Sequence, residues 1–301
     1  MNHAFIIQAH TQPELLCRTV HQLYAKNHFF YIHVDTKSIA AFSRSVCFKS
    51  LKDLPNIRCI ESAINVVWGG YSQIKATIFL LQKVATDTEI KCDYIHFISG
   101  QDYPIVTPSE FDKTFETSSK KAWMEIVTFK GFRKWHYRVD LWFYFDLCHN
   151  QKSLAWHCLK LANKIQRNLF KLHIRFRPPL KNKLYGGSSW FSWNREILMF
   201  VLHHLETHPE LEKRFQMTGG ADEIFFHYIL FNSAHADSIE KNNYRYIDWS
   251  EGKSSPKTLG ISDLQKIMDS NAVLIRKVHS TLSETLLDSI DKILQEKPTA
   301  G

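Results

Sequence analysis

The sequence predicts an α/β protein built on a mostly parallel, doubly wound sheet. Short apolar runs alternate with longer segments of helical periodicity, and the first two runs flank a helix. Such a strand–helix–strand unit pairs its strands in parallel through a right-handed crossover. Polar residues follow the runs directly, and open sheets of this kind bind ligands at the carboxyl ends of their strands.

The first half of the chain supplies most of this pattern. A helix is expected after the capping-box sequence Thr11-Gln12-Pro13-Glu14, and a second one begins at Ser72 after Gly69-Gly70. Strands are predicted at 4–7, 29–34, 57–60, 66–68 and 94–98. Asp35, Trp68 and Asp102 lie at or just past the ends of these strands.

The second half is less regular. It predicts a turn and strand at 185–193, helices at 197–205 and 224–230, a strand at 244–249 and an amphipathic C-terminal helix at about 280–296. Trp190 and Phe191 are interpreted as core residues. The sequence contains no repeat, low-complexity tract or clear linker, so we expect one domain over residues 1–301.

A basic, aromatic insert is predicted at about 130–184. The chain has a formal net charge of +8, and the stretch from Lys152 to Lys183 contains no Asp or Glu. A basic excess indicates an anionic partner: nucleic acid, anionic lipid or a phosphorylated small molecule. Because apolar and basic residues alternate at helical spacing, the insert is either a helix that lies on an anionic membrane or a solvated lid or helix beside the ligand site.

The N-terminal sequence and the spacing of the cysteines indicate in which cellular compartment the protein works. The first residues show no signal peptide, and no apolar run approaches the roughly 20 residues needed to cross a bilayer. The six cysteines show neither C-x-x-C nor zinc-finger spacing, so we expect reduced, mostly buried thiols. These features favour a cytoplasmic protein.

Two acids stand where a glycine-rich turn meets an aromatic run, in Thr218-Gly219-Gly220-Ala221-Asp222-Glu223. A partly dehydrated carboxylate in a cleft can act as a general base. The alternative is that Asp222 caps the following helix while Glu223 stabilises its first turn.

Seven segments in order resemble glycosyltransferase family fourteen, which includes core-2/I-branching β-1,6-N-acetylglucosaminyltransferases and protein O-xylosyltransferases. The likeness runs from about residue 4 to residue 278, and the runs 29–35 and 225–233 are more similar to the xylosyltransferase branch. The segments are 33–35, 67–72, 99–104, 187–191, 221–227, 246–257 and 275–277.

The resemblance implies a GT-A fold, a UDP-sugar donor and inversion by direct displacement. It also implies that basic side chains, rather than a metal ion, neutralise the leaving diphosphate. The sequence agrees, because it has no Asp-x-Asp motif; the nearest match, Asp87-Thr88-Glu89, sits in a polar loop after a helix. We therefore expect no metal and no other cofactor.

Residue roles follow from the same resemblance. Glu223 matches the catalytic base. The positions that match contacts to the nucleotide sugar are His10, Asp35, Trp68, Lys257, Arg276 and Lys277, and those in regions that contact the acceptor are Glu125, Arg138 and Trp249. Asp35 and Asp102 could instead be turn formers at strand ends.

The expected function is metal-independent transfer of N-acetylglucosamine or xylose from a UDP-sugar to a hydroxyl of a glycan acceptor. Without an anchor, a stem or paired cysteines, the chain is expected to be a bacterial-type member that builds surface polysaccharide or lipooligosaccharide. It would be cytoplasmic, with peripheral contact to the inner face of the membrane. A catalytically silent glycan-binding protein and a nucleic-acid-binding protein are the alternatives, although the sequence has no RRM, KH or P-loop signature.

Overall fold

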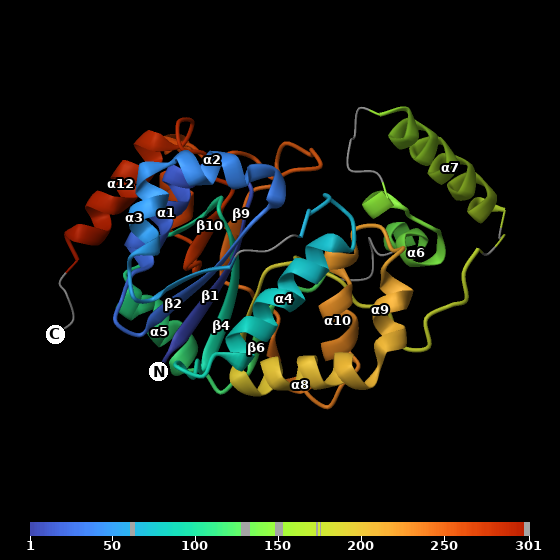
Figure 1. Cartoon of the computed structure of the whole chain (residues 1–301), viewed down its shortest axis with the longest axis horizontal. Helices are drawn as coiled ribbons and strands as arrows, with labels where there is room; N and C mark the ends of the chain where they lie inside the picture. The colour runs from blue at the N-terminus through green and yellow to red at the C-terminus, as the bar shows by residue number, and fades with distance from the viewer. Residues whose placement is uncertain (61–63, 128–132, 148–152, 173, 175, 298–301) are drawn as a thin grey trace.

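The computed structural model describes residues 1–297 except 61–63, 128–132, 148–152, 173 and 175. Strands and helices alternate along the first half of the chain, as predicted (Figure 1). The first elements are β1 (His3–Ala9), α1 (Pro13–Leu23), β2 (His28–Val34), α2 (Ile39–Arg44), α3 (Val46–Lys52), β3 (Ile57–Ile60), α4 (Ser72–Thr86) and β4 (Tyr94–Ser99).

The second half adds short strands among helices. In chain order they are β5 (Asp102–Pro104), α5 (Pro108–Glu116), β6 (Ala122–Met124), α6 (Arg133–Asp140), α7 (Leu154–Lys171), β7 (Phe191–Asn194), α8 (Arg195–Thr207), α9 (Pro209–Phe215), α10 (Phe225–Phe231), β8 (Ile239–Glu240), β9 (Arg245–Ile247), α11 (Leu264–Met268), β10 (Leu274–Arg276) and α12 (Glu284–Gln295).

The central sheet has the strand order β3-β2-β1-β4-β7-β6-β8. Strand β1 pairs in parallel with β2 on one side and with β4 on the other, and β2 pairs in parallel with β3. Strand β7 is antiparallel to both β4 and β6. The predicted mostly parallel sheet is therefore confirmed.

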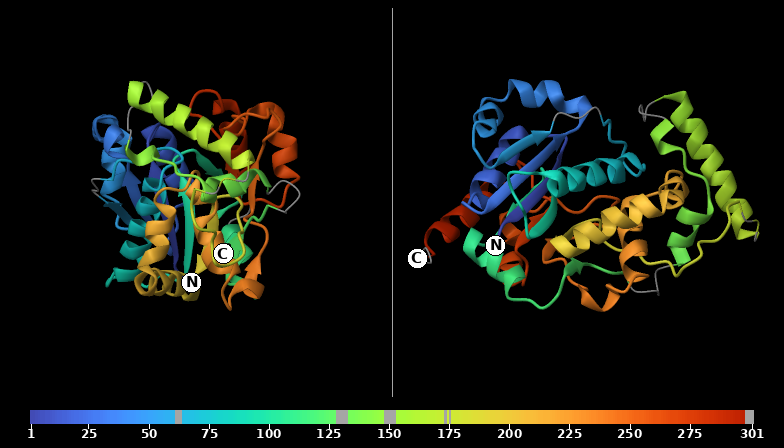
Figure 2. Two further views of the ribbon diagram at one scale, coloured as in Figure 1. Left: turned by 90° about the vertical axis from the view of Figure 1, so that its right-hand side faces the viewer. Right: turned by 60° about the horizontal axis from the view of Figure 1, so that its bottom comes forward.

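Helices cover both faces of this sheet (Figures 1 and 2). Helices α4, α8 and α10 pack on one face and α1, α3 and α5 on the other, each group with its own cluster of buried apolar side chains. Strand β1 lies between the two clusters, so its apolar run from Ala4 to Ile7 is fully buried. Burial on both faces explains why this strand reads as a continuous apolar run.

A second, three-stranded sheet has the order β5-β10-β9. Strand β10 is antiparallel to β5, which sets Arg276 opposite Asp102, and parallel to β9. Helix α12 packs against this sheet through Leu286, Leu287 and Ile290. The predicted strand at 244–249 belongs to this sheet and is shorter than expected.

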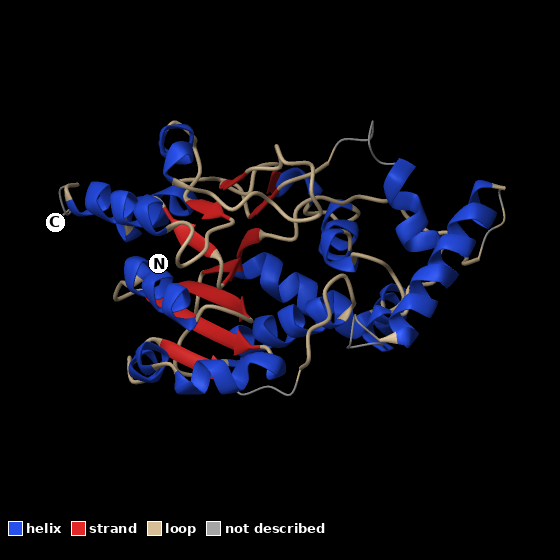
Figure 3. Cartoon of the chain, turned by 90° about the horizontal axis from the view of Figure 1, so that it is seen from above, coloured by secondary structure: helices blue, strands red, loops and turns tan. Residues whose placement is uncertain are grey.

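Helices α6 and α7 lie at the end of the molecule away from the chain termini (Figures 1 and 3). They fall within the predicted insert at 130–184, parts of which lie outside the described residues. Trp156 is the one side chain of α7 that is fully buried among the described residues. No helix in the described part of the chain combines the length and apolar character needed to cross a membrane.

Two local predictions are wrong. Residues 66–68 form no strand; they lead into a turn in which Gly70 N–H donates to Val67 O and Gly69 has a φ of 76°. The capping box before α1 is also absent, because Gln12 takes a left-handed conformation at the N-cap and no side chain caps the helix. The side-chain oxygen of Gln12 instead accepts a hydrogen bond from Ser280 N–H at 2.6 Å.

Five cysteines lie among the described residues, and none of them forms a disulfide bond with another; Cys148 lies outside the described residues. Cys17 and Cys92 are buried, whereas Cys158 is exposed on α7. The expectation that most of the thiols are buried is therefore wrong for the described positions.

Candidate active site

One cleft of about 920 Å³ opens at the carboxyl ends of β1, β2 and β4. Its walls come from segments that are distant in sequence, because parallel pairing brings these strand ends to one edge. Every predicted site residue except Lys257 lines it, namely His10, Asp35, Trp68, Glu125, Arg138, Glu223, Trp249, Arg276 and Lys277.

Glu223 is held by backbone contacts from two glycine-containing segments. It ends a short 3-10 turn, Ala221–Glu223, which begins at Gly220 with a φ of 58°. The carbonyl of Glu223 accepts a hydrogen bond from Gly187 N–H at 2.9 Å. The glycine-rich turns that the sequence singled out therefore fix Glu223 on the cleft wall.

Asp222 does not cap α10, so that alternative is wrong. The N-cap of α10 is Ile224, and no side chain makes a capping hydrogen bond there. Asp222 Oδ2 instead accepts a hydrogen bond from Ser189 Oγ at 2.7 Å across the cleft wall.

Electrostatics favour a basic role for Glu223. Burial raises the pKa of its carboxyl, the neighbouring Asp222 raises it further, and Arg138 offsets part of the rise. Arg138 Nη1 donates to Glu223 Oε2, which leaves Oε1 for another donor. A half-buried carboxylate with a raised pKa binds a proton more readily than one in water.

Glu125 and Arg138 form the neighbouring wall. His227 Nε2 contacts the backbone oxygen of Glu125 at 2.8 Å, and burial raises the pKa of the Glu125 side chain. Arg138 comes from α6 and Glu125 from the segment after β6. Two of the three acceptor-side residues suggested by the resemblance, Glu125 and Arg138, thus lie on the same wall as Glu223.

A cationic corner faces this acidic wall. Arg276 pairs with Asp102 at 2.9 Å and stacks at 4.3 Å on the ring of Trp190. Lys277 forms no ion pair with any carboxylate of the described residues, and burial together with Arg276 lowers its pKa. Lys277 is therefore the cation available for an anionic ligand.

His10 borders the same corner. Burial, Lys277 and Arg276 all lower the pKa of its imidazole, in that order. A neutral imidazole next to two cations can accept or donate one hydrogen bond without adding charge.

The remaining walls offer groups suited to a nucleoside. Asp35 is 4% exposed at the end of β2 and accepts from Lys37 N–H at 3.0 Å, so it is a turn former as well as a cleft residue. Trp68 and Trp249 are 65% and 53% exposed, with ring surface open to the cleft. Flat aromatic surface of this kind can stack on a base or a sugar.

Lys257 lies outside the cleft lining. Its Nζ is 2.6 Å from Asp263 Oδ1 and 3.9 Å from Asp248 Oδ2. Ser254, Ser255 and Pro256 do line the cleft, so the chain turns away immediately before this lysine.

Sequence reasoning missed several supporting residues. Trp190 was interpreted as core, yet it lines the cleft beneath Arg276, whereas Phe191 is fully buried as predicted. Ser189 and Asp102 were part of motifs but had no assigned partner. The motifs mark Ser189 and Asp102 as residues of the site, but only the fold shows that Ser189 binds Asp222 and that Asp102 binds Arg276.

Metal-ligand spacing is found elsewhere. In the described ranges, a His, Asp and Glu group with such spacing is formed by His3, Asp112 and Glu116. His3 is the first residue of β1, at the opposite end of the strand from the cleft.

A test of this wall follows from Gly187. A Cβ added there would lie 2.0 Å from the Glu125 carbonyl oxygen and 2.8 Å from His227 Nε2. Gly187→Ala is expected to lower the free energy of unfolding by about 1–3 kcal/mol through overpacking, measured by urea denaturation. Gly260→Ala, where nothing lies within 4 Å, is the control and should unfold like the parent. Equal stability of the two variants would contradict this packing.

Comparisons with known proteins identify the family of this chain. Residues 3–269 match the sequence family described as Core-2/I-Branching enzyme. Xylosyltransferase 1 of Rattus norvegicus is 27% identical over 248 residues, which cover 82% of this chain and 28% of that protein. A xylosyltransferase of Ciona intestinalis is 24% identical over 295 residues, covering 92% of this chain and 32% of its own length.

Among solved structures, the apo form of mouse xyloside xylosyltransferase 1 aligns over 93% of this chain and 99% of its own, with 11% identity and a TM-score of 0.44. The chain spans about a quarter to a third of the length of the curated relatives it matches. Because the family match covers most of the sequence, including Glu223 and the strands that build the cleft, this chain belongs to the Core-2/I-branching enzyme family. Its mostly parallel sheet flanked by helices is the GT-A fold that the resemblance implied.

Proposed function

We propose that this chain is an inverting glycosyltransferase that moves a sugar from a UDP-sugar to a hydroxyl of a glycan acceptor. The observation that carries the proposal is the cleft itself, in which Glu223 and Lys277 share one cavity with the exposed rings of Trp68 and Trp249. A base, a cation and aromatic surface are the groups that this transfer needs.

The proposed reaction is a single displacement. The acceptor hydroxyl attacks the anomeric carbon while Glu223 takes its proton, and the bond from that carbon to the UDP oxygen breaks. The new bond forms on the face opposite the departing UDP, so the configuration inverts. Asp222 and burial keep Glu223 basic enough to accept the proton, while Arg138 orients its carboxylate.

Charge that builds on the departing diphosphate needs a fixed cation. Lys277 suits this role because no carboxylate of the described residues neutralises it, while Arg276 is already bound to Asp102. A fixed charge in a partly dehydrated cleft stabilises developing negative charge more strongly than the same charge in water. We therefore propose a reaction that proceeds without a metal ion.

For the donor we propose UDP-xylose or UDP-N-acetylglucosamine. The curated relatives named above are xylosyltransferases, which favours xylose. Asp35 at the end of β2 and the ring of Trp68 would bind the uridine. Stacking of a base on an aromatic ring contributes about 1–3 kcal/mol.

Glu223→Gln tests the base. The amide keeps the shape of the side chain but cannot take a proton, so the variant should bind UDP like the parent and lose transfer by orders of magnitude in kcat. UDP binding would be measured by thermal shift, with a single-stranded oligonucleotide as the control ligand for the nucleic-acid alternative. Near-parental turnover would refute the assignment.

The pH dependence of the parent's activity also tests Glu223 as the base. Because the pKa of Glu223 is raised, the base is protonated and inactive at low pH, and activity should grow as pH rises through a value above the ordinary 4.5 of a glutamate. This rise would be measured as kcat/KM of the parent at a series of pH values.

Metal independence is tested by chelation together with Lys277→Gln. Transfer should be unchanged after EDTA, whereas loss of the lysine should weaken UDP binding about 10- to 100-fold, the worth of a charged hydrogen bond. Lys257→Gln is the matched control. The Lys257 ammonium is bound to Asp263, so this variant should lose less UDP affinity than Lys277→Gln. Activity abolished by EDTA and restored by manganese would overturn the scheme.

We further propose that the protein works at the cytoplasmic face of an anionic membrane, on a lipid-linked acceptor of a bacterial surface glycan. Helix α7 supports this, because its inward stripe packs on the protein while Leu161 and Ile165 are 59% and 51% exposed. Lys160, Lys164 and Lys171 are also exposed, and the helix contains no acidic residue. Apolar and basic side chains that share an outer surface are typical of helices that lie on anionic lipid.

Charge reversal on α7 tests the membrane contact. Each lysine near an anionic surface contributes about 1 kcal/mol, so replacing Lys160, Lys164 and Lys171 by Glu should weaken binding to phosphatidylserine vesicles at least 100-fold. The control reverses three exposed lysines at the other end of the molecule, Lys26, Lys49 and Lys52. Unchanged vesicle sedimentation of the α7 variant would favour the solvated-lid alternative.

A further inference from the structure

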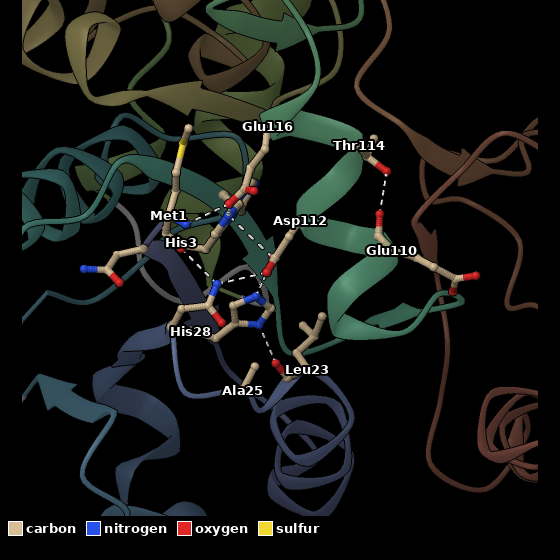
Figure 4. Close-up of polar contacts among 12 residues, drawn as sticks. Met1, His3, Leu23, Ala25, His28, Glu110, Asp112, Thr114 and Glu116 are labelled. Carbon is tan, nitrogen blue, oxygen red and sulfur yellow. Dashed lines mark hydrogen bonds and ion pairs between the residues drawn. The ribbon is translucent and has the colours of Figure 1, made fainter. Parts of the chain in front are cut away.

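A cluster of histidines and carboxylates occupies the end of the sheet opposite the cleft (Figure 4). His3 and His28 begin β1 and β2 and face each other in register, so parallel pairing puts both at this edge. Asp112 and Glu116 lie four residues apart on α5, and this spacing directs both toward His3. Seven residues of β1 separate the cluster from the cleft by roughly 20 Å.

The distances at His3 match a metal site. His3 Nε2 is 3.1 Å from Glu116 Oε1 and 3.5 Å from Asp112 Oδ1. Zinc binds histidine nitrogen and carboxylate oxygen at about 2.0–2.1 Å with tetrahedral geometry, which separates neighbouring ligand atoms by about 3.3–3.4 Å. The two distances from His3 Nε2 are within a few tenths of an ångström of this value, and all three ligand atoms lie within 4.8 Å of one another.

Two of the three ligands, His3 and Asp112, also have outer partners that orient them. His3 Nδ1 lies 2.9 Å from His96 Nε2, and His96 Nδ1 lies 2.9 Å from Ser192 Oγ. Asp112 is held at its two oxygens by His28 Nε2 at 2.6 Å and Asn27 Nδ2 at 2.9 Å. Outer hydrogen bonds of this kind are characteristic of metal-binding histidines and carboxylates.

We propose that His3, Asp112 and Glu116 bind a divalent transition metal of the zinc type, with one position left for water. No proton is lost when the ion binds. The His3 proton sits on Nδ1 instead of Nε2, and His96 shifts its own proton from Nε2 to Nδ1, where it donates to Ser192. Two carboxylates offset the two charges of the ion, and the ion ties β1 to α5.

The side chains around the cluster explain both access and selectivity. His3 is fully buried, whereas the Asp112 and Glu116 side chains are 17% and 27% exposed, so an ion can enter from the α5 side. Met1 N lies 3.0 Å from Glu116 Oε1 and is the contact that the ion must displace. An imidazole ligand favours zinc or cobalt over magnesium or calcium.

The test uses chelator-treated, untagged protein. Zn²⁺ titrated against a competing chromophoric chelator should bind at one ion per chain, and Co²⁺ should give the visible absorption of a tetrahedral centre. Glu116→Gln and Asp112→Asn should each weaken Zn²⁺ at least as much as the 10- to 100-fold that loss of an outer partner costs. Glu196→Gln, a surface carboxylate bound to Lys121 at 2.8 Å, is the matched control and should leave binding unchanged.

Either of two results would overturn the site: no stoichiometric Zn²⁺ binding by the parent, or equal affinity in the Glu116 and Glu196 variants. Glu116 is partly exposed, so its variant remains decisive if Asp112→Asn fails to fold by circular dichroism. Mg²⁺ should give no thermal shift. The chelated parent should still bind UDP, because the cleft shares none of these ligands, so this result stands apart from the proposed transfer activity.

Discussion

Parallel pairing of β1 between β2 and β4 is the constraint on which the rest of the structure depends. The register aligns His3 with His28 and with Tyr94, and Ala9 with Val34, so the strands start together at one edge and end together at the other. The polar residues that follow these three strands are thereby collected at the carboxyl edge. Burial of β1 on both faces fixes this register, because a slip by one residue would turn its apolar side chains out of their packing.

At the carboxyl edge, charge is separated across one cavity. The acidic wall holds Asp222 and Glu223 at a backbone turn, and the cationic corner holds Arg276 and Lys277 at the end of β10. Neither wall neutralises the other within the cleft. Instead, Arg276 forms an ion pair with Asp102, and Arg138 forms one with a single carboxylate oxygen of Glu223. Lys277 can therefore bind an anion, and the second oxygen of Glu223 can accept from a hydroxyl.

The two ends of the sheet illustrate one physical rule applied twice. Burial disfavours charge, so both ends surround their ionisable groups with specific partners. At the cleft these partners are arranged around open space. At the opposite edge, His96, His28 and Asn27 hold His3 and Asp112 in a compact hydrogen-bonded network, which is the basis of the proposed metal site.

The sequence by itself determined the order of the elements and the chemistry of the candidate site. Apolar runs such as Ala4–Ile7 and the motifs around Asp35, Glu223 and Lys277 are local signals, because strand burial, turns and residue identity act over a few neighbours. Only the tertiary structure decided which groups are paired.

Lys257 and Lys277 look alike in sequence, yet Lys257 is bound to Asp263 and Lys277 is open to the cleft. Asp222 reads as a helix cap but accepts from Ser189, thirty-three residues away. Such pairings depend on how distant segments pack, and no local pattern encodes them.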